Sequence, residues 1–256
     1  MGPTKISIRL LIDPAWKNVS DFDFNINRNV DIWRINISSN LALIPALSAL
    51  LSRDEQTRAG RYLHQHDEDR FKISRGALRI IVGRYLNIRP SLIDFKQGIN
   101  KKPYIKNSSL FYNVSHSGDW IILAVSGSEV GVDTERVNPQ FDFNDVIKEY
   151  FSPGECSFIN EDDSTNRFFM LWTRKEALTK ATGKGLDEDL KFIPCTEGVH
   201  LLEDNILLSE NNWIVNSFVL SESYFASVAH HDHNGMIRFW ETDLQNKGWI
   251  GSYELI

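Results

Sequence analysis

The sequence predicts an α+β fold made of two similar halves. Its patterns come in the order strands and helices, then strands, then helices, and strands again. The strand pattern DWIILAVSG at 119–127 has an echo in SYFASVAHH at 223–231, since both are rich in small residues and carry an aromatic residue near the start. Each half also contains a long helical pattern that precedes strands. Two α+β halves joined near residues 126–130 account for these observations.

The first half opens with a strand and a group of helices. Trp33, Ile35 and Ile37 alternate onto one face of a strand. Ser52 is followed three residues later by Glu55, which is the pattern of a capping box at the start of a helix. Helices are therefore expected at 40–51, 52–64 and 66–86, and strands at 109–115, 119–127 and 129–136.

The second half repeats the change from helices to strands. Gly183 and Gly185 follow its longest helical pattern and suit the C-terminal end of a helix. Helices are expected at 143–150, 153–161 and 165–182, and strands at 190–194, 198–203, 212–220, 223–230 and 236–241.

The bulk composition is that of an ordinary globular protein. The 256 residues are 42% hydrophobic and 24% charged, and the net charge is −6. An acidic chain is not a general nucleic-acid binder, although it can contain a local basic pocket. Cys156 and Cys195 match no metal or disulfide pattern, so a reducing, cytoplasmic setting is expected. We expect neither a secretory signal nor a membrane span, because no apolar run has the required length.

Asp133 and Glu135 are the first candidates for chemistry. They lie two residues apart in an expected strand, so their side chains point to the same face. Adjacent carboxylates repel each other, and a hard cation such as Mg²⁺ removes that repulsion. Taken alone, this common spacing more often marks a solvated face of an edge strand.

The stretch FFMLWTRKEALTKATGKGL at 168–186 supplies a third acid. Glu176 and Lys180 lie on one side of the expected helix, four residues apart. A helix-stabilising ion pair explains the two residues, and it contributes only a few tenths of a kcal/mol. A carboxylate at Glu176 that meets Asp133 and Glu135 would instead complete a metal site, and Lys180 could then neutralise a leaving phosphate.

Polar residues also cluster in FYNVSHSGDW at 111–120. Ser115 and His116 are adjacent, so they point apart on a strand and make a poor nucleophile–base pair. These residues either hold a phosphate or belong to an ordinary turn. Basic residues such as Arg58 and Arg70 either line an anion pocket or form a solvated helix face. The histidine clusters at 64–66 and 230–233 are expected to be surface turns.

Six short patterns occur in one order along the chain, namely K-K-P-Y (101–104), N-V-S-H-S (113–117), G-V-D-T-E (131–135), F-S-P-G-E (151–155), W-T-R-K-E-A-L-T-K (172–180) and G-K-G (183–185). Together they resemble the 4′-phosphopantetheinyl transferase superfamily, specifically its larger surfactin-synthetase-activating (Sfp) type. The resemblance covers about residues 52 to 230. It implies two α+β subdomains related by pseudo-twofold symmetry, at 1–127 and 128–256, with coenzyme A bound between them and the metal site in the second.

The resemblance also implies an activity. It is the Mg²⁺-dependent transfer of 4′-phosphopantetheine from coenzyme A to a serine of an apo acyl, peptidyl or polyketide carrier protein, with release of adenosine 3′,5′-bisphosphate. By position, the metal ligands would be Asp133, Glu135 and Glu176. Glu176, or a water that it holds, would act as the base, and Lys180 would stabilise or protonate the leaving phosphate. The implied coenzyme A contacts are Arg58, Arg70, Lys102, Pro103, Ser115, His116 and Lys180.

Two acidic residues need separate comment. Glu55 stands where some members of the family carry a basic residue near the 3′-phosphate of coenzyme A. Glu155 occupies the acidic position of the F-S-x-x-E pattern, and its role is left open.

Two other functions remain open. They are a Mg²⁺-dependent hydrolase of a phosphorylated nucleotide and a coenzyme A-binding protein that transfers nothing. A transferase also needs a face on which the carrier protein docks. The apolar residues available for it, which could equally pack in the core, are Phe141, Phe143, Val146 and Phe151. We expect a monomer with no nucleic-acid and no membrane partner.

Overall fold

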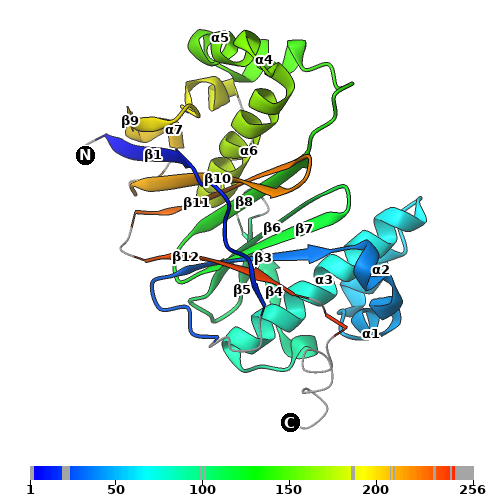
Figure 1. The fold of residues 1–256 in the computed structure, drawn as a ribbon. Coiled ribbons are helices and arrows are strands. Elements are labelled where there is room, and N and C mark those ends of the chain that lie inside the picture. Colours follow the sequence, from blue (N-terminus) through cyan, green and yellow to red (C-terminus); the bar gives the residue numbers. More distant parts are fainter. Residues whose placement is uncertain are drawn as a thin grey trace.

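The computed structural model describes residues 3–18, 24–98, 100, 102–185, 188–207, 209, 211–232, 235–242 and 244–245. These residues form two five-stranded sheets and one two-stranded sheet, with helices packed against them (Figure 1). The predicted α+β class is confirmed. Within the described ranges, no helix has the length and apolar character needed to cross a membrane.

The first half of the chain follows the expected order. Its elements are β1 (Thr4–Leu10), β2 (Lys17–Asn18), β3 (Val30–Asn36), η2 (Ser38–Leu43), α1 (Ile44–Ala49), α2 (Arg53–Ala59), α3 (Gln65–Leu86), η3 (Pro90–Leu92), β4 (Phe95–Gln97), β5 (Pro103–Ile105), β6 (Phe111–Ser117) and β7 (Trp120–Ser126). The capping box of α2 is confirmed, because the Ser52 side chain and the Glu55 side chain each accept the other's backbone N–H. Strands β1, β2, β4 and β5 were not predicted.

The second half contains the three predicted helices and most of the predicted strands. Its elements are β8 (Val130–Arg136), α4 (Asn144–Tyr150), α5 (Pro153–Glu161), α6 (Ser164–Thr182), η5 (Glu188–Phe192), β9 (Gly198–Leu202), α7 (Asp204–Leu207), β10 (Trp213–Ser221), β11 (Tyr224–His231) and β12 (Ile237–Glu241).

The strand expected at 190–194 is wrong, because residues 188–192 form the 3₁₀ helix η5. Leu190 and Ile193 are both fully buried in the same hydrophobic cluster. Residues three apart point the same way on a 3₁₀ turn, whereas on a strand they point to opposite faces. The spacing of these two apolar residues therefore indicates a turn of helix.

Each end of the chain adds a strand to the sheet of the opposite half. The first sheet has the order β8-β11-β10-β1-β9, and β1 pairs with β10 in parallel. The second has the order β2-β12-β3-β7-β6, and β12 pairs with β3 in parallel. The proposed subdomains 1–127 and 128–256 are thus joined by two exchanged strands, and their boundary stays a prediction.

The two sheets share an internal pattern. In one sheet, a first strand (β3), the long helix α3 and a hairpin (β6 and β7) follow one another along the chain, and the strands have the spatial order β3-β7-β6. In the other, the same succession gives β8-β11-β10 around α6. The two echoing stretches of sequence, 119–127 and 223–231, become β7 and β11, which occupy the middle position in these triplets. This repetition supports the predicted pseudo-twofold relation, which stays a prediction.

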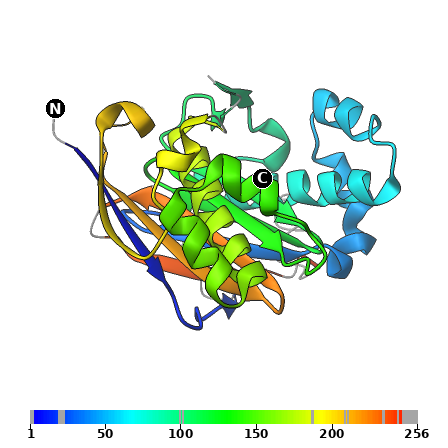
Figure 2. The same ribbon diagram turned by 90° about the horizontal axis from the view of Figure 1, so that it is seen from above.

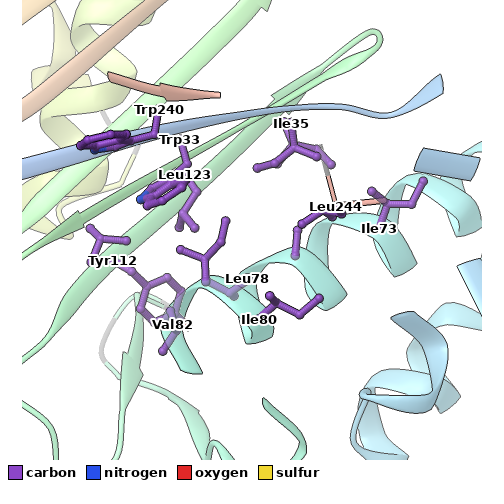
Figure 3. Close-up of a cluster of buried hydrophobic side chains, with 14 of the residues drawn as sticks. Trp33, Ile35, Ile73, Leu78, Ile80, Val82, Tyr112, Leu123, Trp240 and Leu244 are labelled. Carbon is purple, nitrogen blue, oxygen red and sulfur yellow. The ribbon is translucent and has the colours of Figure 1, made fainter. Parts of the chain in front are cut away.

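Three hydrophobic clusters fix the layers. Figure 3 shows the first, in which Leu78 of α3 lies under Trp33 and Leu123 of one sheet. The second packs α6 against β1 and β10 of the other sheet. The third lies between the sheets and joins Ile32 to Val132, among others. The order of layers is therefore α3, one sheet, the other sheet and α6, which Figure 1 shows from bottom to top. Figure 2 looks down on α6, with the sheets behind it.

Helix α6 approaches strand β8 closely at Gly131. A Cβ atom added to Gly131 would stand 2.1 Å from the carbonyl oxygen of Ala177 and 2.3 Å from the backbone nitrogen of Ala181. No heavier residue than glycine fits there without moving the helix. The small side chains of Ala177 and Ala181, on the part of α6 that faces Gly131, also allow the close approach.

A buried glutamate ties the first half together. Glu55 accepts a hydrogen bond from Arg79 at 2.7 Å and also pairs with Arg75. Arg79 in turn donates to the carbonyl groups of Pro90 at 2.8 Å and Ile93 at 3.2 Å. Burial alone would raise the pKa of Glu55, but the two arginines outweigh it and lower the pKa.

Glu155 is a buried glutamate that ties the second half together in the same way. It belongs to the capping box of α5, and its carboxylate pairs with Lys175 at 3.1 Å and accepts the backbone N–H of Cys195 at 2.8 Å. Lys175 donates to the carbonyl groups of Leu190 at 2.9 Å and Ile193 at 2.5 Å. Both charges are fully enclosed, so Glu155 and Lys175 hold α5, α6 and η5 together and do not face the solvent.

We predict that Gly131→Ala destabilises the protein by about 1–3 kcal/mol, because the new methyl group overlaps the backbone of α6. Gly154→Ala is the matched control, since an added Cβ there meets no described atom within 4 Å. Urea unfolding of both variants measures the difference. Equal midpoints for the two variants would contradict the close approach of α6 to β8.

We predict that Lys175→Met costs about 3–5 kcal/mol, because it leaves the Glu155 carboxylate buried without its cation. Lys148→Met is the control, since Lys148 is exposed and its ion pair is with exposed Asp145. The double variant Lys175→Met with Glu155→Gln should recover part of the loss. Chemical denaturation measures all four proteins, and a loss in Lys175→Met no greater than in Lys148→Met would refute the prediction.

Candidate active site

Strand β6 lies beside strand β8 where the two sheets meet. Asn113, Ser115 and Ser117 alternate along β6, so they share one face. Asn113 accepts a backbone N–H of β8 at 3.0 Å. The Ser115 hydroxyl donates to Asp133 at 2.8 Å, and the Ser117 hydroxyl donates to Glu135 at 2.9 Å. The N-V-S-H-S pattern therefore binds the two acids of the G-V-D-T-E pattern, which sequence reasoning did not foresee.

Asp133 is the buried centre of this group. Its Oδ1 atom accepts from Lys180 Nζ at 2.6 Å and from Ser115. Lys180 also donates to the Ser115 hydroxyl at 3.2 Å. The Oδ2 atom of Asp133 is buried and has no hydrogen-bond partner among the described residues. One carboxylate oxygen is thus fixed by α6 and β6, while the other is left free.

Lys180 remains a cation in this setting. Burial opposes its charge, but the charge of Asp133 and a hydrogen bond to it, followed by Glu176 and Glu135, outweigh burial and raise the pKa of the ammonium group. The helix-stabilising pair with Glu176 alone does not explain Lys180, because its nearest charged contact is Asp133, on β8.

The carboxyl groups of Glu135 and Glu176 have raised pKa values. Burial and the neighbouring charge of Asp133 raise the pKa of Glu135 to about 7. The same two causes raise the pKa of Glu176. The structure thus brings the three predicted acids and Lys180 within electrostatic reach of one another. Among the described residues, no three His, Cys, Asp or Glu side chains form a group that could hold a metal ion.

A cavity of about 160 Å³ opens beside Glu176 and Lys180. Lys102 and Pro103, for which the resemblance implies contacts with coenzyme A, line it from the first half of the chain. Its remaining lining residues, most of which sequence reasoning missed, are Asn100, Asn113, Thr179, Gly183 and Gly185. Residue 101 of the K-K-P-Y pattern lies outside the described residues.

Lys102 ties the two halves together at this cavity. Its ammonium group contacts Glu129 at 3.3 Å and donates to the carbonyl oxygen of Ala181 near the end of α6. Its alkyl chain runs past Gly183, whose φ of +75° favours glycine. Glu129 also accepts from His231 at 3.4 Å, and neither partner of Lys102 was foreseen.

His116 and Arg70 lie near the acids as well. His116 is an exposed residue, yet removal of water from its ring, and then the charges of Arg70 and Lys180, lower its pKa. The lowered pKa favours the neutral imidazole. Arg70 is bound to Asp67 of the same helix at 2.5 Å.

Arg58 lies farther out, at a second cavity of about 420 Å³. Its guanidinium group stands 5.0 Å from the ring centre of Phe71. Glu55 lines the same cavity, where its charge is neutralised by arginines. Pro103 lines both cavities, so the two are neighbours.

A third, more apolar cavity of about 370 Å³ includes Glu135 in its lining. Phe141 and Val146 also line it, and Phe141 is exposed. Phe151, by contrast, is buried in the core, and the ring of Phe143 stacks on a neighbouring phenylalanine. The four residues named as a docking face thus divide, with Phe141 and Val146 accessible and Phe151 packed inside.

The histidine clusters behave differently from each other. His64 and His66 stack on one another at the surface, as predicted. His230 is buried in β11, so the surface turn expected there is wrong for this residue. The chain alternates at this point, which turns His230 inward and leaves His231 partly exposed. His233 lies outside the described residues.

Comparison with known proteins places this geometry in a family. A model of the 4′-phosphopantetheinyl transferase superfamily matches residues 129–229, and a model of the 4′-phosphopantetheinyl transferase N-terminal region matches residues 40–128. A putative 4′-phosphopantetheinyl transferase of Synechocystis sp. is 32% identical over 215 residues, which cover 80% of this chain and 85% of that protein.

Two further relatives agree. The 4′-phosphopantetheinyl transferase HetI of Nostoc sp. is 30% identical over 223 residues, which cover 84% of this chain and 93% of that protein. The 4′-phosphopantetheinyl transferase Sfp of Bacillus subtilis is 30% identical over 142 residues, covering 54% and 62% of the two chains. With the three acids, Lys180 and the polar ladder of Asn113, Ser115 and Ser117 gathered where β6, β8 and α6 meet, the chain belongs to the 4′-phosphopantetheinyl transferase superfamily and is of the Sfp type.

Proposed function

We propose that the protein transfers the 4′-phosphopantetheine group of coenzyme A to a serine of an apo carrier protein and releases adenosine 3′,5′-bisphosphate. The observation that carries the proposal is the cluster of Asp133, Glu135 and Glu176 around the Lys180 ammonium group. Carboxylates grouped around a lysine suit a reaction on a pyrophosphate. The relatives of the chain are named for this transfer.

The three acids fit a Mg²⁺ ion by their chemistry. Asp133 Oδ2 is a buried oxygen with no hydrogen-bond partner in the described ranges. Glu135 and Glu176 are destabilised as anions by Asp133, and a divalent cation would relieve that repulsion. We infer that these three residues hold Mg²⁺, which when bound neutralises charge on the pyrophosphate.

Glu176 and Lys180 are the proposed catalytic residues. The oxygen of the carrier serine forms a bond to the phosphorus that carries pantetheine, and the bond from that phosphorus to the bridging oxygen of the pyrophosphate breaks. Glu176 accepts the serine proton, directly or through a water that it holds. Lys180, kept cationic by the acids, stabilises the leaving phosphate.

The proposed coenzyme A site follows the neighbouring cavities. Lys102, Pro103 and Lys180 line the first, and Arg58 lines the second beside Pro103. Ser115, His116 and Arg70 complete the proposed contacts near Asp133. Because Lys102 is already bound to Glu129, we infer that it orients the site as well as meeting the nucleotide.

The proposed carrier approaches from the side of Glu135. The apolar cavity there, with exposed Phe141, supports a docking face for an acyl or peptidyl carrier protein. A monomeric state, a cytoplasmic location and the absence of nucleic-acid and membrane partners stay predictions.

We predict that the purified protein, with coenzyme A and Mg²⁺, adds one phosphopantetheine group to an apo carrier protein. Intact-mass spectrometry of the carrier measures the gain. Glu176→Gln should lower the rate at least about 100-fold, because the base is lost, and EDTA should abolish transfer. Glu203→Gln, an exposed change between β9 and α7 at a residue that lines none of these three cavities, should leave the rate unchanged.

The alternatives give different results in the same experiment. Coenzyme A that binds but stays intact on acyl, peptidyl and polyketide carriers alike would indicate a binding protein. Coenzyme A that is cleaved while the carrier keeps its mass would indicate a hydrolase.

We predict that the affinity for Mg²⁺ rises about tenfold between pH 6 and pH 8. Glu135 has a pKa of about 7, so it is mostly protonated at pH 6 and must lose that proton to bind a cation. Calorimetric titration of Mg²⁺ across this range gives the affinity, and buffers with different ionisation heats report the protons released. Binding with no proton release and no pH dependence would show that Glu135 does not bind the ion.

A further inference from the structure

Ser117 is a small residue beside the acid cluster, and neither the sequence patterns nor the relatives give it a role. Its hydroxyl group donates to Glu135 Oε2 at 2.9 Å. The Ser117 hydroxyl oxygen accepts the backbone N–H of Arg136 at 3.0 Å. A serine hydroxyl has one proton, and an N–H already points at its lone pair. The direction of the Ser117 proton is therefore set toward the carboxylate.

The backbone under Ser117 is fixed as well. The next residue, Gly118, has a φ of +50°, and a Cβ there would stand 2.3 Å from the Tyr224 hydroxyl oxygen. That hydroxyl accepts the backbone N–H of Asp119 at 3.2 Å. The turn between β6 and β7 therefore packs against Tyr224 of β11, and β11 pairs with β8. Ser117 is consequently held in place from both sides.

The two serines of the ladder have different surroundings. Ser115 shares Asp133 with the Lys180 ammonium group, so that acid keeps a cationic partner without the serine. For Glu135, the hydrogen bond that the structure gives within the described residues comes from Ser117. The hydroxyl group of Ser117 therefore bears on the orientation of the Glu135 carboxylate.

We propose that Ser117 is a positioning residue that fixes the Glu135 carboxylate in the orientation in which it binds the metal ion. The inference rests on the proposed function, since it takes Glu135 as a ligand of Mg²⁺. Hydrogen-bond donors behind a ligating carboxylate commonly change metal affinity by 10- to 100-fold.

The test compares Ser117→Ala with Ser117→Thr. Mg²⁺ is titrated calorimetrically into each protein in the presence of coenzyme A, and thermal unfolding without metal is recorded in parallel. Ser117→Ala should weaken Mg²⁺ binding about tenfold. Ser117→Thr keeps the hydroxyl group and should stay within about twofold of the unaltered protein. Ser157→Ala is the control, because Ser157 is exposed on α5 and donates only to a carbonyl of its own helix.

The outcomes separate this inference from the proposed function. Mg²⁺ binding by Ser117→Ala that equals that of the unaltered protein overturns the positioning role and leaves the function intact. Equal weakening in Ser117→Ala and Ser117→Thr also overturns it, because the hydroxyl group then has no special part. Failure of the unaltered protein to bind Mg²⁺ refutes the metal site itself, and the inference falls with it.

Discussion

The close approach of helix α6 to strand β8 is the constraint on which the site depends. Gly131 leaves room for the backbone at Ala177 and Ala181 and no room for a side chain of its own. Glu176 and Lys180 lie on the same turns of α6 as these alanines. At this separation the Lys180 ammonium group reaches Asp133 at 2.6 Å. A wider gap would place a shell of water between them and remove the perturbation that gives the acids and the lysine their character.

The polar ladder of β6 gives the second constraint. Asn113, Ser115 and Ser117 belong to one sheet, and the acids that two of them bind belong to the other. The acid cluster therefore forms only when the two sheets are packed face to face. Lys102 adds a further bond between the halves, at the end of α6. Exchange of the terminal strands β1 and β12 locks the same arrangement, because neither sheet is complete without the other half of the chain.

Local patterns predicted those parts of the protein that short-range physics determines. Helical spacing and the capping box at Ser52 located α2 and α3, and alternation located β3. The pairing of Asp133 with Lys180 needed the family resemblance, since no periodicity brings a strand and a distant helix together. The strand exchange could not be predicted, because parallel pairing of distant strands leaves no mark in either segment. Glu155 and Lys175 were missed as a structural pair for a similar reason: charge in a sequence says nothing about burial.

The repeated framework explains how the second half can tolerate a costly site. Both halves contain a capping-box glutamate, Glu55 or Glu155, that binds a cation of the long helix, and that cation also binds the carbonyl groups of the following 3₁₀ turn. The strand next to the helix differs, however. On β3 the helix-facing side carries Trp33 and Ile35, which belong to the core. On β8 it carries Asp133 and Glu135, which repel each other. The apolar version stabilises the fold, whereas the repulsion in the acidic version weakens it, as stability is commonly given up at a functional site. The proposed Mg²⁺ ion would relieve that repulsion. The buried Glu155–Lys175 pair holds α6 in place, so the repulsion between Asp133 and Glu135 does not displace the helix.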